Sequence, residues 1–281
     1  MNDLRQNETK KEPAKKPLKE KQIQLLMLLA AALAVIISAV AVFLPHSGTT
    51  STAGGGSGGL SGGGKDQNDP YYLTYPSENY DSFTVFVDAG HGYDDPGAFT
   101  DYLGGLYESD INLDMALRLR DKLSARGINV IMSRTENVKP DGHENEKYVL
   151  SPIDRAELVN SSDTTINLMI SLHCNSFPSD ESVKGTRLYF YAGSDTYTCA
   201  LARDEADGIT SVLKDNTPRL FSMKYDDAYY ILKNTSLPAV LVECGFVTNP
   251  DDAALMLNEK WKDDFTTGLA EGIFKFFNMT D

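Results

Sequence analysis

Apolar residues recur over residues 82–278 in two alternating patterns, one typical of helices and one typical of buried strands. One apolar residue in every four predicts a helix that opens at Glu108 and ends at Gly127. Another helix is predicted to begin at Ser151, with Pro152 and Asp154 in its first turn. Further helical patterns cover 198–213 and 261–277, a short one starts at 249, and apolar runs predict strands at 83–88, 128–133, 165–172, 186–191, 229–232 and 239–243. Because strands alternate with helices, we expect an α/β domain with a largely covered sheet.

A nearly unbroken apolar run at residues 23–44 precedes this domain. At ~1.5 Å per residue, a helix of this length spans roughly 33 Å, enough to cross a bilayer. Residues 1–22 hold seven Lys or Arg residues against four acidic ones, which predicts a cytoplasmic tail. We therefore expect a single-pass membrane anchor with the folded domain outside the cell. The alternative is a cleaved signal peptide and a secreted protein, although the apolar region of a signal is usually only about 7–15 residues.

Composition narrows the classes of partner. Residues 45–81 form a Gly/Ser-rich linker that cannot build a core, which leaves 82–278 as a single folded domain. The chain of 281 residues has a net charge of −14, which repels nucleic acid and argues against a polyanion-binding protein. Its three cysteines do not form a disulfide framework and are more typical of small buried side chains. A bridge between Cys174 and Cys244 is the alternative.

Four residues carry the candidate chemistry. His91, His173 and Glu243 each stand at the end of a predicted strand, where the sites of α/β sheets form. Glu108 opens a predicted helix. Two imidazoles and a carboxylate suit an open zinc site at His91, Glu108 and His173, and Glu243 would then be the base that such a site needs. Each residue also has a structural alternative: a hydrogen-bonded histidine, or a glutamate placed at a helix N-terminus by the helix dipole.

The sequence around these residues resembles the zinc-dependent N-acetylmuramoyl-L-alanine amidases of the amidase 3 type. The resemblance extends over residues 83–277 and follows the order of the family's blocks. These blocks are VFVDAGHGYDDPGA, ESDINLDMALRLRDKLSARG, LSPIDRAELVN followed by INLMISLHCNS, and LPAVLVECGFVTNPDDAALM. Together they are specific, although no single block is.

The resemblance implies a mixed, roughly six-stranded sheet flanked by helices. It implies His91, Glu108 and His173 as ligands of Zn²⁺ and Glu243 as the catalytic base. The implied reaction is hydrolysis of the amide between N-acetylmuramic acid and L-alanine in peptidoglycan, in wall remodelling or spore-cortex maturation. An extracellular domain on a membrane anchor suits this substrate.

Two further residues and two other functions remain open at this point. Asn175 follows His173 by two positions, so strand alternation returns it to the same side, where it could face substrate. Arg155 could pair with a carboxylate near the sheet in a structural role. The same metal set would serve a zinc peptidase or an amidase for another wall bond. A non-catalytic wall-associated protein on the same fold is the remaining alternative.

Overall fold

The domain is built on a mixed six-stranded sheet. The computed structural model describes residues 83–191, 196–223, 229–235 and 237–279. The strand order is β4-β1-β5-β8-β6-β7, in which β6 runs antiparallel to β8 and the other pairs are parallel. The strands are β1 (Thr84–Ala89), β4 (Asn129–Met132), β5 (Leu168–Asn175), β6 (Arg187–Tyr191), β7 (Arg219–Met223) and β8 (Ala239–Phe246). This confirms the expected mixed sheet.

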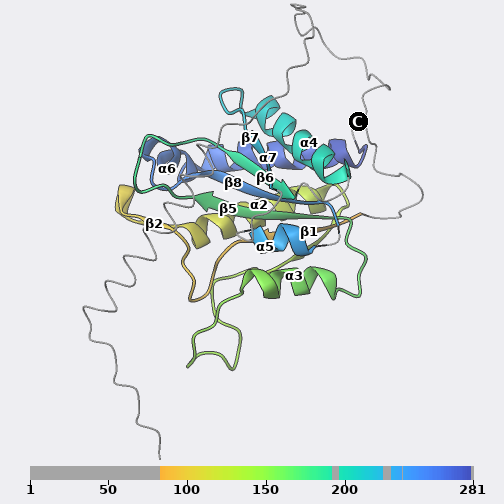
Figure 1. Cartoon of the computed structure of the whole chain (residues 1–281), viewed down its shortest axis with the longest axis horizontal. Coiled ribbons are helices and arrows are strands. Elements are labelled where there is room, and N and C mark those ends of the chain that lie inside the picture. The colour runs from red at the N-terminus through yellow and green to blue at the C-terminus, as the bar shows by residue number, and fades with distance from the viewer. Residues whose placement is uncertain (1–82, 192–195, 224–228, 236, 280–281) are drawn as a thin grey trace, which may run out of the picture. The chain divides into compact units, whose positions relative to one another are not determined.

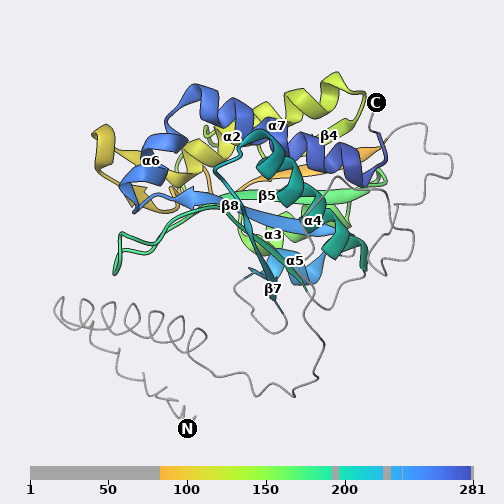
Figure 2. The ribbon, with the colours of Figure 1, turned by 90° about the horizontal axis from the view of Figure 1, so that it is seen from above.

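Helices cover both faces of the sheet (Figures 1 and 2). One layer contains α2 (Glu108–Ala125), α4 (Thr196–Val212) and α7 (Glu259–Phe276), and the other contains α3 (Pro152–Asn160) and α5 (Tyr230–Asn234). Successive strand residues point to opposite faces of the sheet. Val87, Ile170 and Val242 pack in the core under the first helix layer, and Phe86, Met169 and Leu241 pack in the core under the second. Helix α6 (Pro250–Met256) follows β8, and β2 (Phe99–Thr100), η1 (Tyr102–Gly104) and β3 (Leu106–Tyr107) lie before α2.

Local sequence sets the helix ends that matter for the site. Ser151 and Asp154 form a reciprocal capping box, and Pro152 occupies the first position of α3. Gly127 follows the end of α2 with φ of 80°, a conformation that glycine adopts without strain. These signals explain why both helix boundaries were predictable.

Helices α4 and α7 approach closely because glycines line their contact. A Cβ atom on Gly208 would lie 2.1 Å from the carbonyl oxygen of Gly268, and one on Gly272 would lie 2.4 Å from Cα of Glu205. The carboxyl group of Glu205 is fully buried there, and neither of its oxygens has a hydrogen-bond partner. Burial, together with the neighbouring Asp204, raises the pKa of Glu205 well above its usual value.

The two ends of the described domain meet at the amino end of β1. The ring of Phe83, directly before β1, stacks on the ring of Phe277, directly after α7, with centroids 4.1 Å apart. Arg126 donates a hydrogen bond of 2.7 Å to the carbonyl of Met279. The chain therefore enters and leaves the domain on one side.

Some predicted elements differ from the structure. Residues 229–232 were predicted as a strand, but Tyr230–Asn234 is the helix α5, which packs on the sheet instead of extending it. Strand β5 starts three residues later than predicted and runs on to Asn175, and β8 runs on to Phe246, so His173 and Glu243 lie inside strands. Strand β7 was not predicted.

The predicted tail at 1–22, anchor at 23–44 and linker at 45–81 lie outside the described residues. Within the part of the chain that the structure describes, no helix is both long enough and apolar enough to cross a bilayer.

Candidate metal centre

The three predicted metal ligands converge at the carboxyl end of the sheet. His91 lies in the loop after β1, Glu108 is the first residue of α2, and His173 lies in β5. Each offers one ligand atom, and these atoms lie within 4.8 Å of one another. Glu108 Oε1 is 3.2 Å from His91 Nε2 and 3.0 Å from His173 Nδ1. Three separate elements thus bring together a His/Glu/His donor set, which is the set that an open zinc site uses.

The backbone at His91 adopts a conformation that non-glycine residues rarely take, with φ of 58°. Such strain costs about 1–3 kcal/mol and persists where the surroundings enforce it. Here Arg155 donates a hydrogen bond of 2.6 Å to the carbonyl of His91. Asp95 Oδ2 lies 2.8 Å from Nδ1 of the ring and leaves Nε2 turned toward Glu108. A carboxylate on the far ring nitrogen is how metal-binding histidines are commonly oriented.

Glycine is required where the loop passes the ligands. A Cβ atom on Gly90 would lie 2.2 Å from Nε2 of His173. One on Gly97 would lie 2.7 Å from Oε2 of Glu108. Any side chain at either position would push a ligand out of place.

The carboxylate of Glu108 is buried but fully satisfied. The backbone N–H groups of Cys174 and Ala98 donate to its two oxygens at 3.0 and 2.9 Å. Burial alone would raise the pKa of Glu108, but the imidazoles of His173 and His91 hold this pKa far below its usual range. The carboxylate is therefore ionised whenever the protein is folded near neutral pH.

The negative charge of Glu108 favours a positive charge on the His91 imidazole. Burial opposes protonation of His91, yet the carboxylates of Glu108 and Asp95 outweigh burial and raise its pKa to about 9. An imidazole proton therefore balances the carboxylate charge within this cluster. A divalent cation would have to displace that proton, so metal binding weakens as the pH falls.

Glu243 stands beside the ligands on the neighbouring strand. It is paired in register with His173 and is only 8% exposed. Its Oε2 has no hydrogen-bond partner. Burial raises its pKa to about 7, with the His173 charge opposing and the Glu108 charge adding to this effect. A carboxyl with this pKa can both accept and return a proton at neutral pH.

Glu243 and the histidines share one cavity of about 260 Å³. Leu150, Tyr229 and Tyr230 are among the other residues that line it. Glu108 is buried and does not line this cavity. The open side of the donor set and the proton-accepting carboxyl therefore face the same volume.

Arg155 and the fully buried Asp88 hold the loop that carries His91 against the sheet. Arg155 forms an ion pair with Asp88 and also donates to the carbonyl of Ala89 at 2.8 Å. Ser171 donates a hydrogen bond of 2.6 Å to the other oxygen of Asp88. Burial alone would raise the pKa of Asp88, but Arg155 and the hydroxyl partners keep it below the usual value. The structure thus gives Arg155 a carboxylate partner in the sheet.

Arg134 was not identified from the sequence. Its guanidinium donates to the carbonyls of Ala89 and Gly90, both at 2.9 Å, and to that of Ser109 at 2.8 Å. It therefore fastens the loop that carries His91 to the first turn of the helix that carries Glu108. Asp88 and Asp95 were also missed, although an aspartate inside the apolar run before His91 was a usable signal for Asp88.

Asn175 is the last residue of β5 and lies beyond His173 on the same strand. The register of β5 against β8 shifts between these two residues, and Asn175 pairs with Phe246. The Asn175 side chain is half-buried, and its Oδ1 accepts a hydrogen bond of 2.9 Å from the N–H of Ser176. A substrate-binding role for Asn175 stays a prediction.

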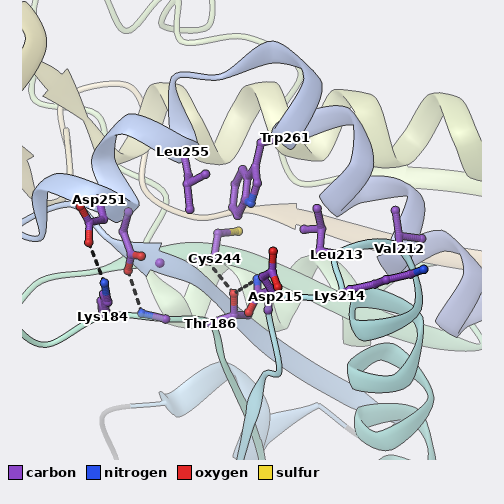
Figure 3. A pocket seen from close by; sticks show the side chains of 14 residues that line it. Lys184, Thr186, Val212, Leu213, Lys214, Asp215, Cys244, Asp251, Leu255 and Trp261 are labelled. Carbon is purple, nitrogen blue, oxygen red and sulfur yellow. Dashed lines mark hydrogen bonds and ion pairs between the residues drawn. The ribbon is translucent and has the colours of Figure 1, made fainter.

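A larger cavity, of about 570 Å³, includes the residue next to Glu243 (Figure 3). Cys244 contributes to its lining between Leu255 and Trp261, and it points to the opposite face of β8 from Glu243. The carboxylate of Asp251 is paired with Lys184 at 2.6 Å.

All three cysteines are free thiols, so the structure holds no Cys174–Cys244 bridge. Among the described residues, the one side-chain group that could hold a metal is the His/Glu/His set.

Comparison with known proteins gives matches over this whole domain. The family model described as N-acetylmuramoyl-L-alanine amidase matches residues 85–275. The germination-specific N-acetylmuramoyl-L-alanine amidase of Bacillus subtilis is 30% identical over 197 residues, which cover 69% of this chain and 79% of that protein.

Solved structures agree with the sequence matches. An N-acetylmuramoyl-L-alanine amidase from Clostridium difficile 630 superposes with a TM-score of 0.61 at 27% identity and covers 72% of this chain and all of its own. The CwlD amidase from Clostridioides difficile, solved in complex with the GerS lipoprotein, also gives a TM-score of 0.61, at 26% identity and 71% coverage of this chain.

Proposed function

The chain belongs to the N-acetylmuramoyl-L-alanine amidase family and is an enzyme of that class, and we propose that it is a zinc-dependent hydrolase of peptidoglycan. The bond cut is the amide between N-acetylmuramic acid and L-alanine, in the wall or in the spore cortex. One observation carries the zinc proposal: three ligand atoms of the right chemistry converge beside a buried carboxyl that has an unpartnered oxygen.

The residues divide the work as follows. His91, Glu108 and His173 would hold the ion, and the ion would polarise the scissile carbonyl and ease loss of a proton from water. Glu243, with a pKa of about 7, would accept the water proton and deliver it to the leaving nitrogen. This delivery matters because an amine leaves poorly unless it is protonated.

The remaining polar groups fix these atoms in place. Asp95 orients the His91 ring, and Arg155 and Arg134 hold the backbone of the loop. Pre-organised donors and acceptors avoid rearrangement during the reaction. The close fit of Gly90 to the His173 ring serves the same end.

The test is digestion of an intact muropeptide by the purified chain, with identification of the new chain ends. We expect a new amino terminus on L-alanine and an intact glycan. Elemental analysis of the same preparation should give about one zinc per chain, the content of a catalytic site with three protein ligands. A new terminus elsewhere in the peptide would mean a peptidase, and unchanged muropeptide would favour a non-catalytic wall protein.

We also propose that residues 23–44 anchor the enzyme in the cell membrane with the catalytic domain outside. Support comes from the length of the apolar run and the basic residues before it. The experiment is cell fractionation of the full chain combined with protease treatment of intact cells. Release of the domain into the medium without protease would indicate a cleaved signal instead.

A further inference from the structure

Two arginines lie beside Glu243 on the antiparallel edge of the sheet. Arg187 on β6 is the direct register partner of Glu243 on β8. Residues directly opposite in an antiparallel pair project from the same face, so Arg187 stands on the face that carries the base. On the edge strand β7, Arg219 is in turn the register partner of Arg187. The face thus carries a carboxyl and two cations on three successive strands.

Arg187 is held in a fixed position by aromatic rings. Its guanidinium carbon lies 4.5 Å from the ring centroid of Phe246 and 5.6 Å from that of Phe221. Such contacts stabilise a cation and orient the planar guanidinium fork without using its hydrogen-bond donors. The Nε of Arg187 is buried and has no hydrogen-bond partner.

Within the described ranges, neither arginine forms an ion pair. The carboxyl opposite Arg187 is that of Glu243, where burial raises the pKa and the Arg187 charge opposes that rise. Like charges side by side on neighbouring strands are unfavourable. A buried donor without an acceptor is also costly. An anion bound between the two side chains would relieve both costs.

The strand order of these side chains indicates which part of a substrate would lie beside the two arginines. His173 lies on β5, Glu243 on β8, and Arg187 on β6, and neighbouring strands are about 4.8 Å apart. If the carbonyl of a bound amide lies at the ligands and its nitrogen at Glu243, a chain that continues along the strand order passes over β6 and β7. In the proposed substrate the nitrogen belongs to the peptide, and about 3.5 Å per extended residue brings the next one or two residues over the arginines.

We propose that Arg187 and Arg219 form a subsite for a carboxylate of the peptide that is released, so that the enzyme selects acidic stem peptides. The inference rests on the proposed amidase function. The fork of Arg187 binds a carboxylate through two parallel hydrogen bonds, which a carboxamide cannot reproduce. Arg219 is exposed and adds a weaker, screened attraction.

The experiment compares two soluble muramoyl peptides that differ only in the second residue, which carries either a free carboxylate or a carboxamide. For the full wild-type chain we expect kcat/KM to favour the acid by about 10- to 100-fold, as for a charge-assisted hydrogen bond. Arg187→Gln should bring the ratio of the two kcat/KM values close to one. Arg219→Gln, at an exposed position, should lower the ratio by about 2- to 5-fold.

The ratio is measured within one preparation, so partial misfolding of a variant does not affect it. Arg120→Gln is the matched control, because Arg120 is a surface arginine on α2 paired with Asp121, and it should keep the wild-type ratio. A wild-type ratio near one, or an Arg187→Gln variant that slows both substrates equally, would overturn the subsite.

A binding measurement separates this inference from the proposed function. Calorimetric titration of the full chain with the free acidic peptide and its amidated analogue needs no turnover. If the chain cleaves neither substrate but binds the acidic peptide more tightly, and Arg187→Gln removes the difference, the amidase proposal fails and the subsite stands. Equal binding of both peptides refutes the subsite even if cleavage is observed.

Discussion

At the scale of single residues, Glu243 is buried and one of its oxygens has no hydrogen-bond partner. This arrangement lowers the stability of the fold, which indicates that the carboxyl has a functional role. It faces the cavity above the metal ligands but is not one of the three converging ligand atoms. Its environment therefore suits a group that exchanges protons, and its loss should be separable from loss of the metal.

We predict that Glu243→Gln lowers kcat by about 10²- to 10⁴-fold, the usual contribution of a general base, and leaves the zinc content unchanged. Single-turnover cleavage of a muropeptide and elemental analysis of the same sample check both parts. His173→Ala is the contrasting variant and should lose the metal as well. A Glu243→Gln protein that has lost its zinc would instead make Glu243 a ligand.

Glu205 is the opposite case, a buried carboxyl with no role in the site. Its pKa is raised in the folded state, so the folded protein binds more protons than the unfolded chain at pH values above the ordinary pKa of 4.5. Stability from this group is therefore complete below that pKa and is lost as the pH rises toward the folded value.

We predict that Glu205→Met stabilises the protein by about 1–3 kcal/mol at pH 8, because it removes a buried polar group without a partner. The gain should shrink toward pH 4.5, where the native carboxyl is protonated. Urea unfolding at both pH values measures this, with Glu271→Gln on the exposed surface of α7 as the control. An equal gain at both pH values would contradict a raised pKa.

At the scale of elements, the contact between α4 and α7 depends on the absence of side chains. Gly208, Gly268 and Gly272 place backbone against backbone: a Cβ atom added to Gly208 would lie only 2.1 Å from the carbonyl oxygen of Gly268. Exposed glycines inside helices normally cost about 0.5–1 kcal/mol relative to alanine. A Gly→Ala substitution therefore destabilises the protein if the close helix packing dominates, and stabilises it if the helix propensity of alanine dominates.

Gly208→Ala should destabilise the fold by about 1–3 kcal/mol, because the added Cβ forces the two helices apart. Thermal unfolding followed by circular dichroism is the measurement. The matched control is Glu271→Ala on the solvent side of α7, which should change stability by less than about 0.5 kcal/mol. A stabilised Gly208→Ala protein would mean that the helices tolerate separation.

The elements with strong local signals were predictable, and those fixed by tertiary contacts were not. The capping box at Ser151 and the periodic run of α2 are local, so both helices were found. The apolar run at 229–232 was too short to separate strand from helix by periodicity, and packing on the sheet decided for a helix. The edge strand β7 is mostly exposed and lacks the apolar run of a buried strand.

The residues of the site also divide into those with a local sequence signal and those placed by tertiary contacts. His91, His173 and Glu243 could be found because each follows or ends an apolar run, and Glu108 because it opens a periodic helical run. The family resemblance then implied the role of each residue. The hydrogen bonds of Arg134 and Arg155 to the loop and the pairing of Arg187 with Glu243 join residues far apart in the sequence. Strand order and register create these contacts, and no local pattern encodes them.

At the scale of the whole molecule, the ligand set connects three parts of the domain: the loop after β1, the start of α2 and the carboxyl-terminal part of β5. An ion that binds only the folded state stabilises it by mass action, by about 2.7 kcal/mol at a free concentration 100 times the dissociation constant. Because backbone donors and imidazoles satisfy Glu108, we expect the domain to stay folded without the ion.

We predict that a chelator abolishes cleavage and lowers the unfolding temperature while the far-ultraviolet circular dichroism at 25 °C stays unchanged. Added zinc should restore both activity and unfolding temperature, and the latter should rise with zinc concentration. His91→Ala serves as the control and should show no zinc-dependent shift. A chain that unfolds on chelation at 25 °C would show that the metal is part of the folding reaction itself.

The position of Phe83 against Phe277 has a consequence for how the enzyme meets a solid substrate. Both termini of the domain leave from the amino end of β1, whereas His91 lies just past its carboxyl end, six strand residues away. At about 3.3 Å per residue, the two ends of the described domain lie some 20 Å from the loop that carries His91, at the opposite end of β1. A polymeric substrate can therefore reach the candidate metal centre without passing either of these ends.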